Sequence, residues 1–323
     1  MLDPDLRPLF DETVAFEEAQ ARLTSAELGD GLPLVPPTKR RLTKMLAGLS
    51  DPDRVLDLMP PMFGEITAED VAYQCVLAGC RPGVVPLVMT AALAILAPEF
   101  NLLGLATTTG SAAVGLIVHG AAAKAHDITD GINCIGPGHG PNATIGRALS
   151  LVLRNVGGAR SGTGDMATVG QPGKFTFCFA ESDEGLLPPL PERRGVEGPA
   201  GEVTVLGFSG TAEVLPDEER SSPESVLDPL ARIMLASNAT TGADRRKPAP
   251  DQVFILPPEL ARLILAAGWD LARIQGYLHN KGVAPAPGAI HPVVAGGPGV
   301  KMAYIPMWGG DSRPVTRAIL VPD

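Results

Sequence analysis

A glycine-alternating loop that runs directly into an amphipathic helix is the feature that most constrains this chain. The loop and the first helical turns read IGPGHGPNATIGR over residues 135–147. Apolar residues then recur at helical spacing from Ile145 to Val156, and two glycines at 157–158 end the pattern. Pro141 suits the first helical turn, because its fixed φ is helical and its missing N–H would be unbonded there. The sequence therefore predicts a helix over 140–156.

The start of this helix is a candidate anion site. Free backbone N–H groups and the positive end of the helix dipole favour a carboxylate, a phosphate or an oxyanion. A glycine-rich segment after a later predicted strand could add a further nest of N–H groups. The alternative is a tight turn that packs a helix on a sheet. The expected substrate-binding residues are Thr108, Thr109, Gly136, Gly138, His139, Asn142, Thr144, Arg147, Gly296 and Gly297.

The order of predicted elements indicates an α/β fold, with α+β as the alternative for the N-terminal part. The chain of 323 residues is 45% hydrophobic, and its 37 glycines and 32 prolines are typical of many loops between short elements. Residues 188–201, rich in proline, glycine and charge, are the best candidate linker. We therefore expect two packed α/β units with glycine-rich loops. The first domain, 1–190, carries Cys80 and the glycine loop, and the second spans 191–323.

Periodicity places the individual elements. A nearly all-apolar helix over 86–96 must be buried on most sides. No internal repeat with a period of 20–50 residues is evident. The expected strands are 101–106, 114–118, 173–180, 203–208, 252–256, 291–295, 302–306 and 315–320, and the later helices are 225–236, 258–267 and 271–281.

Charge and hydropathy indicate which binding partners and which cellular compartment to expect. The net charge is −10, with no basic cluster interleaved with aromatic residues, so nucleic acid is not an expected partner. The longest apolar runs, Val84–Ala97 and Ala112–Ala123, are too short to span a bilayer. The N-terminus has no apolar segment typical of a signal peptide, which favours a cytoplasmic protein. The scattered histidines and cysteines do not match a metal-binding spacing.

The cysteines supply the candidate nucleophiles. Cys80 follows a predicted helix, and the guanidinium of Arg81 beside it would favour the thiolate. Cys134 borders the glycine loop and is the second candidate. We therefore predict Cys80, Arg81 and Cys134 as catalytic residues, with small buried cysteines as the alternative. The charged residues Asp165, Lys174 and Glu181 are expected to be solvated ends of an apolar strand.

Seven segments in order resemble one family. They are GLPLVPPT at 31–38, AGCRP at 78–82, NATIGRAL at 142–149, DMAT at 165–168, KFTFC at 174–178, VAGG at 294–297 and SRPVTR at 312–317. The chain thus resembles the large protein or domain associated with UGSC-type selenoproteins and their cysteine-containing counterparts. Longer members continue into a small domain with a UGSC or CGSC motif, which this sequence does not contain. It also has Gly83-Val84 in place of an acidic and an aromatic residue, and His139-Gly140 in place of Asn-Arg.

The resemblance implies thiol-redox chemistry and a small CGSC or UGSC partner protein. Together with the predicted anion site, it favours an enzyme subunit that acts on a small anionic metabolite by thiol-dependent chemistry, as an oxidoreductase or a lyase. No other cofactor is evident. The alternatives are a stand-alone non-redox lyase or hydrolase and a binding or scaffold subunit of a metabolic complex. A homo-oligomer is expected, because the apolar helix over 86–96 needs covering on most of its circumference.

Overall fold

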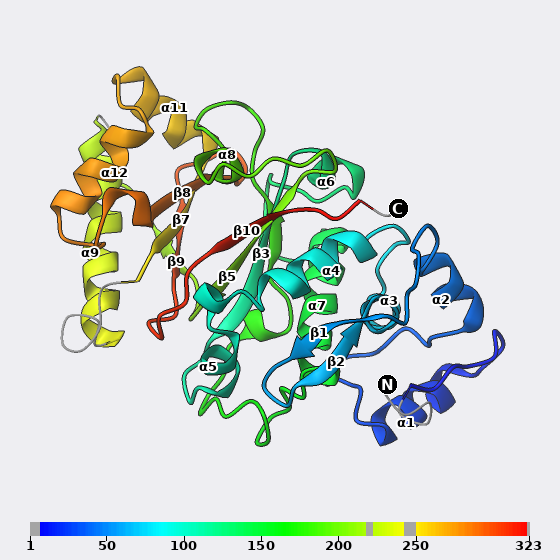
Figure 1. Ribbon diagram of the computed structural model, residues 1–323. Helices are drawn as coiled ribbons and strands as arrows, with labels where there is room; N and C mark the ends of the chain where they lie inside the picture. The colour runs from blue at the N-terminus through cyan, green and yellow to red at the C-terminus, as the bar shows by residue number, and fades with distance from the viewer. Residues whose placement is uncertain (1–6, 218–221, 242–249, 322–323) are drawn as a thin grey trace.

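The structure is a computed structural model that describes residues 7–217, 222–241 and 250–321. Two four-stranded sheets lie at its centre, with helices outside each of them (Figure 1). An N-terminal region precedes the sheets, and its last long helix packs on the first sheet. This region contains α1 (Phe16–Ser25), α2 (Lys39–Met45), the hairpin of β1 (Val55–Met59) and β2 (Gly64–Thr67), α3 (Ala68–Ala78), α4 (Val85–Ala94), η2 (Pro98–Phe100) and α5 (Leu102–Thr107).

The first sheet has the strand order β10-β5-β3-β4. Strand β3 runs parallel to β4 and antiparallel to β5, and β5 runs antiparallel to β10. Helices α6 (Gly120–Ala125) and α7 (Gly140–Asn155) connect the two parallel strands. The strands are β3 (Ala113–His119), β4 (Cys178–Ala180), β5 (Glu202–Phe208) and β10 (Val315–Ala318), and the short helices η3 (Pro172–Lys174) and α8 (Leu190–Arg193) flank β4 along the chain.

The second sheet repeats this arrangement with the order β6-β9-β7-β8. Strand β7 runs parallel to β8 and antiparallel to β9, which in turn runs antiparallel to β6. Helices again connect the parallel pair. The elements are β6 (Ala212–Val214), α9 (Pro223–Thr241), β7 (Gln252–Leu256), α11 (Pro258–Ala266), α12 (Leu271–Asn280), η4 (Pro287–Ala289), β8 (Ile290–Val294) and β9 (Met302–Pro306).

The two units exchange their outer strands. Strand β6 follows β5 in sequence but pairs with β9, and β10 follows β9 but pairs with β5. The two units begin at residues 113 and 252. This spacing is much longer than the roughly 20–50-residue period of a typical repeat protein. The boundary expected at residue 190 divides the first sheet, since β5 and β10 follow it and both belong to the sheet of β3.

Strand alternation divides the side chains among three apolar layers. In β3, Leu116 faces helices α3, α4 and α7, whereas Ile117 faces the second sheet. In β7, Phe254 faces α9, α11 and α12, whereas Ile255 packs against the first sheet. The molecule is therefore a four-layer helix–sheet–sheet–helix sandwich (Figure 1), which confirms the predicted α/β fold.

Two predicted strands are wrong in whole or in part. Residues 101–106 were expected to form a strand, but Asn101 adopts φ 53° and caps α5, its side chain accepting from the N–H of Gly104. A left-handed residue interrupts a strand, and the asparagine side chain caps the helix that follows. The strand expected over 173–180 is restricted to β4, because Pro172 starts the 3-10 turn η3.

The apolar helix expected over 86–96 is α4, and the chain itself covers it. Eight of its ten residues are buried, among them Val85, Leu87 and Val88. Helices α3 and α7 and strands β5 and β10 contact it. The exposed apolar surface that suggested a homo-oligomer is therefore absent from α4.

Candidate functional site

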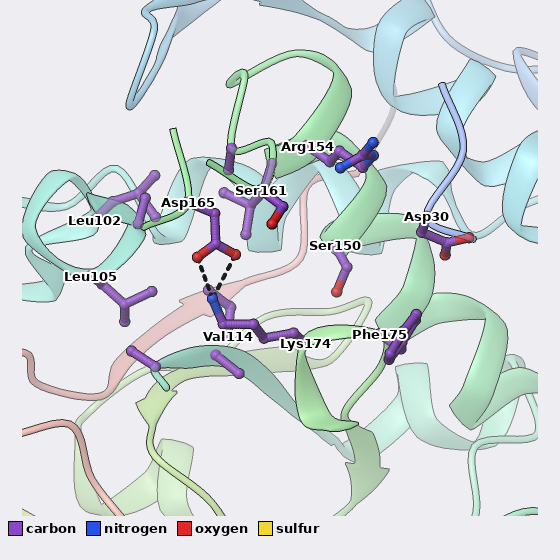
Figure 2. A pocket seen from close by; sticks show the side chains of 15 residues that line it. Asp30, Leu102, Leu105, Val114, Ser150, Arg154, Ser161, Asp165, Lys174 and Phe175 are labelled. Carbon is purple, nitrogen blue, oxygen red and sulfur yellow. Dashed lines mark hydrogen bonds and ion pairs between the residues drawn. The ribbon is translucent and has the colours of Figure 1, made fainter. Parts of the chain in front are cut away.

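A cavity of about 180 Å³ lies where α7 and α5 approach the first residues of β3 (Figure 2). Leu102 and Leu105 of α5, Val114 of β3 and Phe175 give it an apolar side. Its volume lies below the roughly 300–1,000 Å³ of sites for drug-sized ligands, so it suits a smaller metabolite. The charged residues in its lining are Asp30, Arg154, Asp165 and Lys174, and the hydroxyl residues are Ser150 and Ser161.

Lys174 and Asp165 form an ion pair in this cavity (Figure 2). Lys174 Nζ donates to both carboxylate oxygens of Asp165, at 2.7 and 2.6 Å. Asp165 Oδ1 also accepts from the N–H of Ala167 at 3.1 Å, which orients the carboxylate. The two side chains are 21% and 23% exposed, so both remain accessible from the cavity. The cavity thus offers an ammonium group and a carboxylate at a fixed separation.

Arg154 supplies a cation without a partner. It lies in the last turn of α7, and within the described ranges no hydrogen bond or ion pair holds its guanidinium, whose Nε is buried. Burial lowers the pKa of Arg154, and the positive charge of Arg160 lowers it further. The carboxylates of Asp30, Glu27 and Asp165 act in the opposite direction. An anion at this position would replace the water that Arg154 has lost.

The predicted helix of the glycine loop is confirmed as α7, but the side chains in its first turn bond to the protein itself. Asn142 is buried, and its Oδ1 accepts from the N–H of Thr129 at 3.0 Å. Its Nδ2 donates to the carbonyls of Thr129 and Cys134, both at 3.0 Å. His139 Nε2 lies 2.8 Å from the carbonyl oxygen of Ile132. Asn142 and His139 therefore fix the preceding loop.

Arg147 and Thr144 are engaged in the same way. Arg147 holds both carboxylate oxygens of Asp30, at 2.7 and 2.8 Å, and donates to the carbonyls of Leu32 and Pro33 at 3.3 and 3.0 Å. Four of its five N–H groups are thus in use. Thr144 Oγ1 donates to the carbonyl of Gly140 at 2.9 Å. Arg147 attaches the segment at 30–33 to α7, and one N–H is left for a ligand.

The remaining glycine candidates shape the loop. Gly136 donates to the carbonyl of Asn133 at 2.8 Å, and Gly138 adopts φ 111°, which favours glycine. Gly296 donates to the carbonyl of Asp130 at 2.6 Å. Gly297 packs so closely on Ile132 that no side chain would fit. The structure therefore joins the 130–138 loop to the segment after β8, but through contacts between the two backbones.

The second candidate thiol and the threonine turn lie apart from the charged cavity. Cys134 is buried in the layer between the sheets, and burial, followed by the charge of Asp130, raises the pKa of its thiol to about 11. Thr108 Oγ1 accepts from the N–H of Gly110 at 3.1 Å, and the carbonyl of Thr109 accepts from Thr168 at 2.9 Å. None of these residues belongs to the lining of the cavity in Figure 2.

Cys80 is half-buried at the end of α3, where its Sγ donates to the carbonyl of Thr144 at 3.3 Å. The guanidinium of Arg81 is exposed and donates to Asp127 Oδ2 at 2.7 Å. Asp127 therefore competes for the cation that was expected to assist Cys80. Cys80 is likewise absent from the cavity lining.

Cys80 lies in a group of three thiols that its spacing from Cys75 did not predict. An ideal helix would separate two residues five apart by about 140°. Gly79 ends α3 with φ 82°, however, and the N–H of Cys80 bonds to the carbonyl of Cys75 at 2.9 Å. Burial first, and then the contact with Cys80, raises the pKa of Cys75. Burial first, and then the negative charge of an ionised Cys80, raises the pKa of Cys178.

Sequence reasoning missed the charged cavity. Lys174 and Asp165 were expected to be solvated strand ends, because charged residues beside an apolar strand usually are. The two residues come into one site only because the 158–167 loop folds back onto α7. This fold of the loop is held by the N–H groups of residues 163–165, which bond to the carbonyl of Arg160. The available signal was composition: a polar, glycine-rich loop over 162–168 is too flexible for core.

Within residues 7–217, 222–241 and 250–321, no group of three or more His, Cys, Asp or Glu side chains is arranged to hold a metal ion. No single helix in those ranges has the length and apolar character needed to cross a membrane; Val85–Ala94 and Pro98–Thr107 reach it only as a pair bent by 75°. No protein-family model matches the chain, and no curated protein is significantly similar to it.

Proposed function

We propose that the protein is an enzyme that acts on a small carboxylate by non-redox proton transfer in the cavity of Figure 2. The observation that carries this proposal is the unpartnered Arg154 in the same cavity as the Lys174–Asp165 pair. Arg154 would hold the ligand's carboxylate, because a guanidinium pairs with it through two parallel N–H bonds. Leu102, Leu105 and Phe175 would cover an apolar body of a few carbon atoms.

The chemistry follows from the ion pair. The ammonium of Lys174 can stabilise negative charge that develops on a ligand oxygen when a proton leaves the adjacent carbon. The carboxylate of Asp165, which pairs with that ammonium, can accept the proton. This step begins an elimination, so a lyase is the reaction class that these groups support best. A hydrolase would use the same pair to activate and orient water.

Replacing Arg154 by glutamine tests the binding site. We expect this variant to bind small mono- and dicarboxylates about ten- to a hundred-fold more weakly, since a hydrogen bond to a charged group contributes roughly 1.5–3 kcal/mol. Titration calorimetry with acids of three to six carbons gives the affinities. Arg232→Gln removes an exposed arginine that pairs with Asp217, and it is the matched control. Equal affinity in the two variants would exclude Arg154 as the anion contact.

Thiol-dependent chemistry is the second candidate function, and the grouping of Cys80 with Cys75 and Cys178 favours it. All four cysteines lie in the part of the chain that the structure describes. Cys80 is the only one of them that is not buried. It should therefore react with iodoacetamide faster than the other three, as peptide mass spectrometry would measure. A Cys80→Ser protein should lose the fast-reacting site. Equal labelling of Cys80 and Cys178 would count against thiol catalysis.

A further inference from the structure

The layer between the two sheets changes from apolar to polar at one end. Along the inner face of β3, Ile117 is followed by His119, and along that of β5, Leu206 is preceded by Thr204. His119 Nε2 lies 2.8 Å from Thr204 Oγ1, which lies 2.9 Å from Thr316 Oγ1 of β10. All three polar side chains are buried. The inter-sheet core therefore ends in a hydrogen-bonded polar row.

A cavity of about 900 Å³ lies at this polar end, with Thr316 in its wall. Residues of both units form it, from α8, β8 and the segment that leads into β10. Cationic side chains outnumber carboxylates, although the whole chain carries a net charge of −10. The ionisable residues in the lining are Arg193, Arg194, Arg313, Arg317, His291, Asp251 and Glu99.

Two of the four arginines have carboxylate partners. Arg193 Nη2 donates to Glu181 Oε1 at 3.0 Å, inside the protein. Arg317 Nη2 lies 3.8 Å from Glu99 Oε1 at the exposed rim. The charge of Arg193 inside the protein and that of Arg317 at the exposed rim are therefore each paired with a carboxylate.

Arg194 has no carboxylate partner. Its Nη1 donates to the carbonyl of Pro314 at 2.9 Å, and its Nη2 lies 3.4 Å from His291 Nε2. Its Nε is buried without a partner, and none of the described carboxylates lies within 4.0 Å of the guanidinium. Burial lowers the pKa of Arg194, and the charge of Asp251 only partly offsets this. Asp251 is itself occupied, with Oδ2 2.9 Å from His291 Nε2.

Arg313 is the second unpaired cation. Its N–H donates to the carbonyl of Glu99 at 2.9 Å, which fixes the backbone, but its exposed side chain has no partner among the residues that the structure describes. It adjoins Pro314, whose carbonyl receives Arg194. The cavity therefore presents one unpaired guanidinium inside and another at the rim.

We propose that this cavity is a second ligand site, which binds a phosphorylated metabolite with its phosphate between Arg194 and Arg313. A phosphate dianion matches two unpaired guanidinium groups in charge and accepts their N–H bonds in the planar geometry that arginine offers. The cavity volume is within the range of sites for ligands of nucleotide size. This site is separate from the carboxylate cavity and does not depend on the function proposed for it.

Calorimetric titration with inorganic pyrophosphate at constant ionic strength tests the site. The wild-type chain should bind pyrophosphate, and Arg313→Gln, a change at the exposed rim, should weaken binding several-fold. Arg194→Gln should weaken it about ten- to a hundred-fold. Circular dichroism and urea unfolding establish that both variants are folded. If Arg194→Gln does not fold, the rim variant alone decides the outcome.

Variants elsewhere locate the bound anion. Arg154→Gln and Lys174→Met alter the carboxylate cavity and should leave the affinity for pyrophosphate unchanged. If they abolish binding while Arg313→Gln has no effect, the anion occupies the other cavity and the proposal is wrong. It is equally wrong if wild-type protein binds neither phosphate nor pyrophosphate, or binds sulfate and pyrophosphate alike with no loss in Arg313→Gln.

Discussion

Replacing Glu181 by alanine should lower the free energy of unfolding by about 3–5 kcal/mol, the cost of removing one member of a buried ion pair. The Glu181 side chain is only 4% exposed. Its Oε1 accepts from Arg193 at 3.0 Å, and its Oε2 accepts from the N–H of Leu190 at 2.8 Å. His119 Nδ1 also lies 2.8 Å from Oε2, without forming a hydrogen bond to it.

The loss would be large because Arg193 has little else to bind. Its Nε and Nη1 are already buried without partners, and Nη2 would keep only the carbonyl of Pro292, at 2.9 Å. Urea unfolding, monitored by circular dichroism, measures the change in the free energy of unfolding. An equal slope of this free energy against urea concentration in wild type and variant would indicate an unchanged unfolded state. The control is Glu184→Ala, which removes an exposed pair with Arg262 and should cost about 0–1 kcal/mol. Similar losses in the two variants would contradict this account.

Replacing Lys174 by methionine should slow the reaction of the proposed enzyme by about a hundred- to a thousand-fold, the usual cost of removing a group that stabilises developing negative charge. Methionine keeps much of the length of the side chain but cannot donate to Asp165 or stabilise charge on a ligand. Deuterium exchange gives a readout that needs no knowledge of the product. Protein in D₂O should remove the NMR signal of the hydrogen next to the carboxylate of a bound acid, and Lys174→Met should not.

Two variants separate chemistry from folding in this experiment. Lys301→Met removes an exposed lysine that pairs with Glu213, and it should exchange at the wild-type rate. Asp165→Asn keeps the shape of the pair but loses the base, so it should be as slow as Lys174→Met. Exchange at the wild-type rate in Lys174→Met, with ligand bound, would exclude proton transfer at this pair.

Local pattern was sufficient to predict most of the elements. The strands over 252–256 and 302–306 have the predicted bounds, and α7 differs from its prediction by one residue at its end. Apolar alternation and helical spacing are properties of consecutive residues, so they can be read without knowing the fold. Strand pairing is different. Nothing near Val315 indicates that β10 joins β5 and not the neighbouring β9, because that choice depends on how the two units meet.

The small anionic ligand expected from the sequence stays a prediction, because the side chains proposed to bind it are engaged within the protein. Asn142 bonds to the preceding loop, and Arg147 bonds to Asp30, which is far away in sequence. Asp30 is an example. Burial alone would raise its pKa, yet the hydrogen bonds from Arg147 and the N–H of Leu32 lower it. Such pairing depends on tertiary contacts, and a single sequence gives no sign of it. Glu181, expected to be a solvated end of a strand, is buried for the same reason.

The exchange of outer strands has a consequence for synthesis on the ribosome. The first sheet begins with β3 at Ala113, but its edge partner β10 starts only at Val315. Until β10 has emerged, β5 presents an unpaired row of N–H and carbonyl groups, a template on which another nascent chain could add a strand. A ribosome that pauses between these positions would leave that edge open. Strand β10, the last strand in the described ranges, therefore protects the first sheet from pairing with another chain.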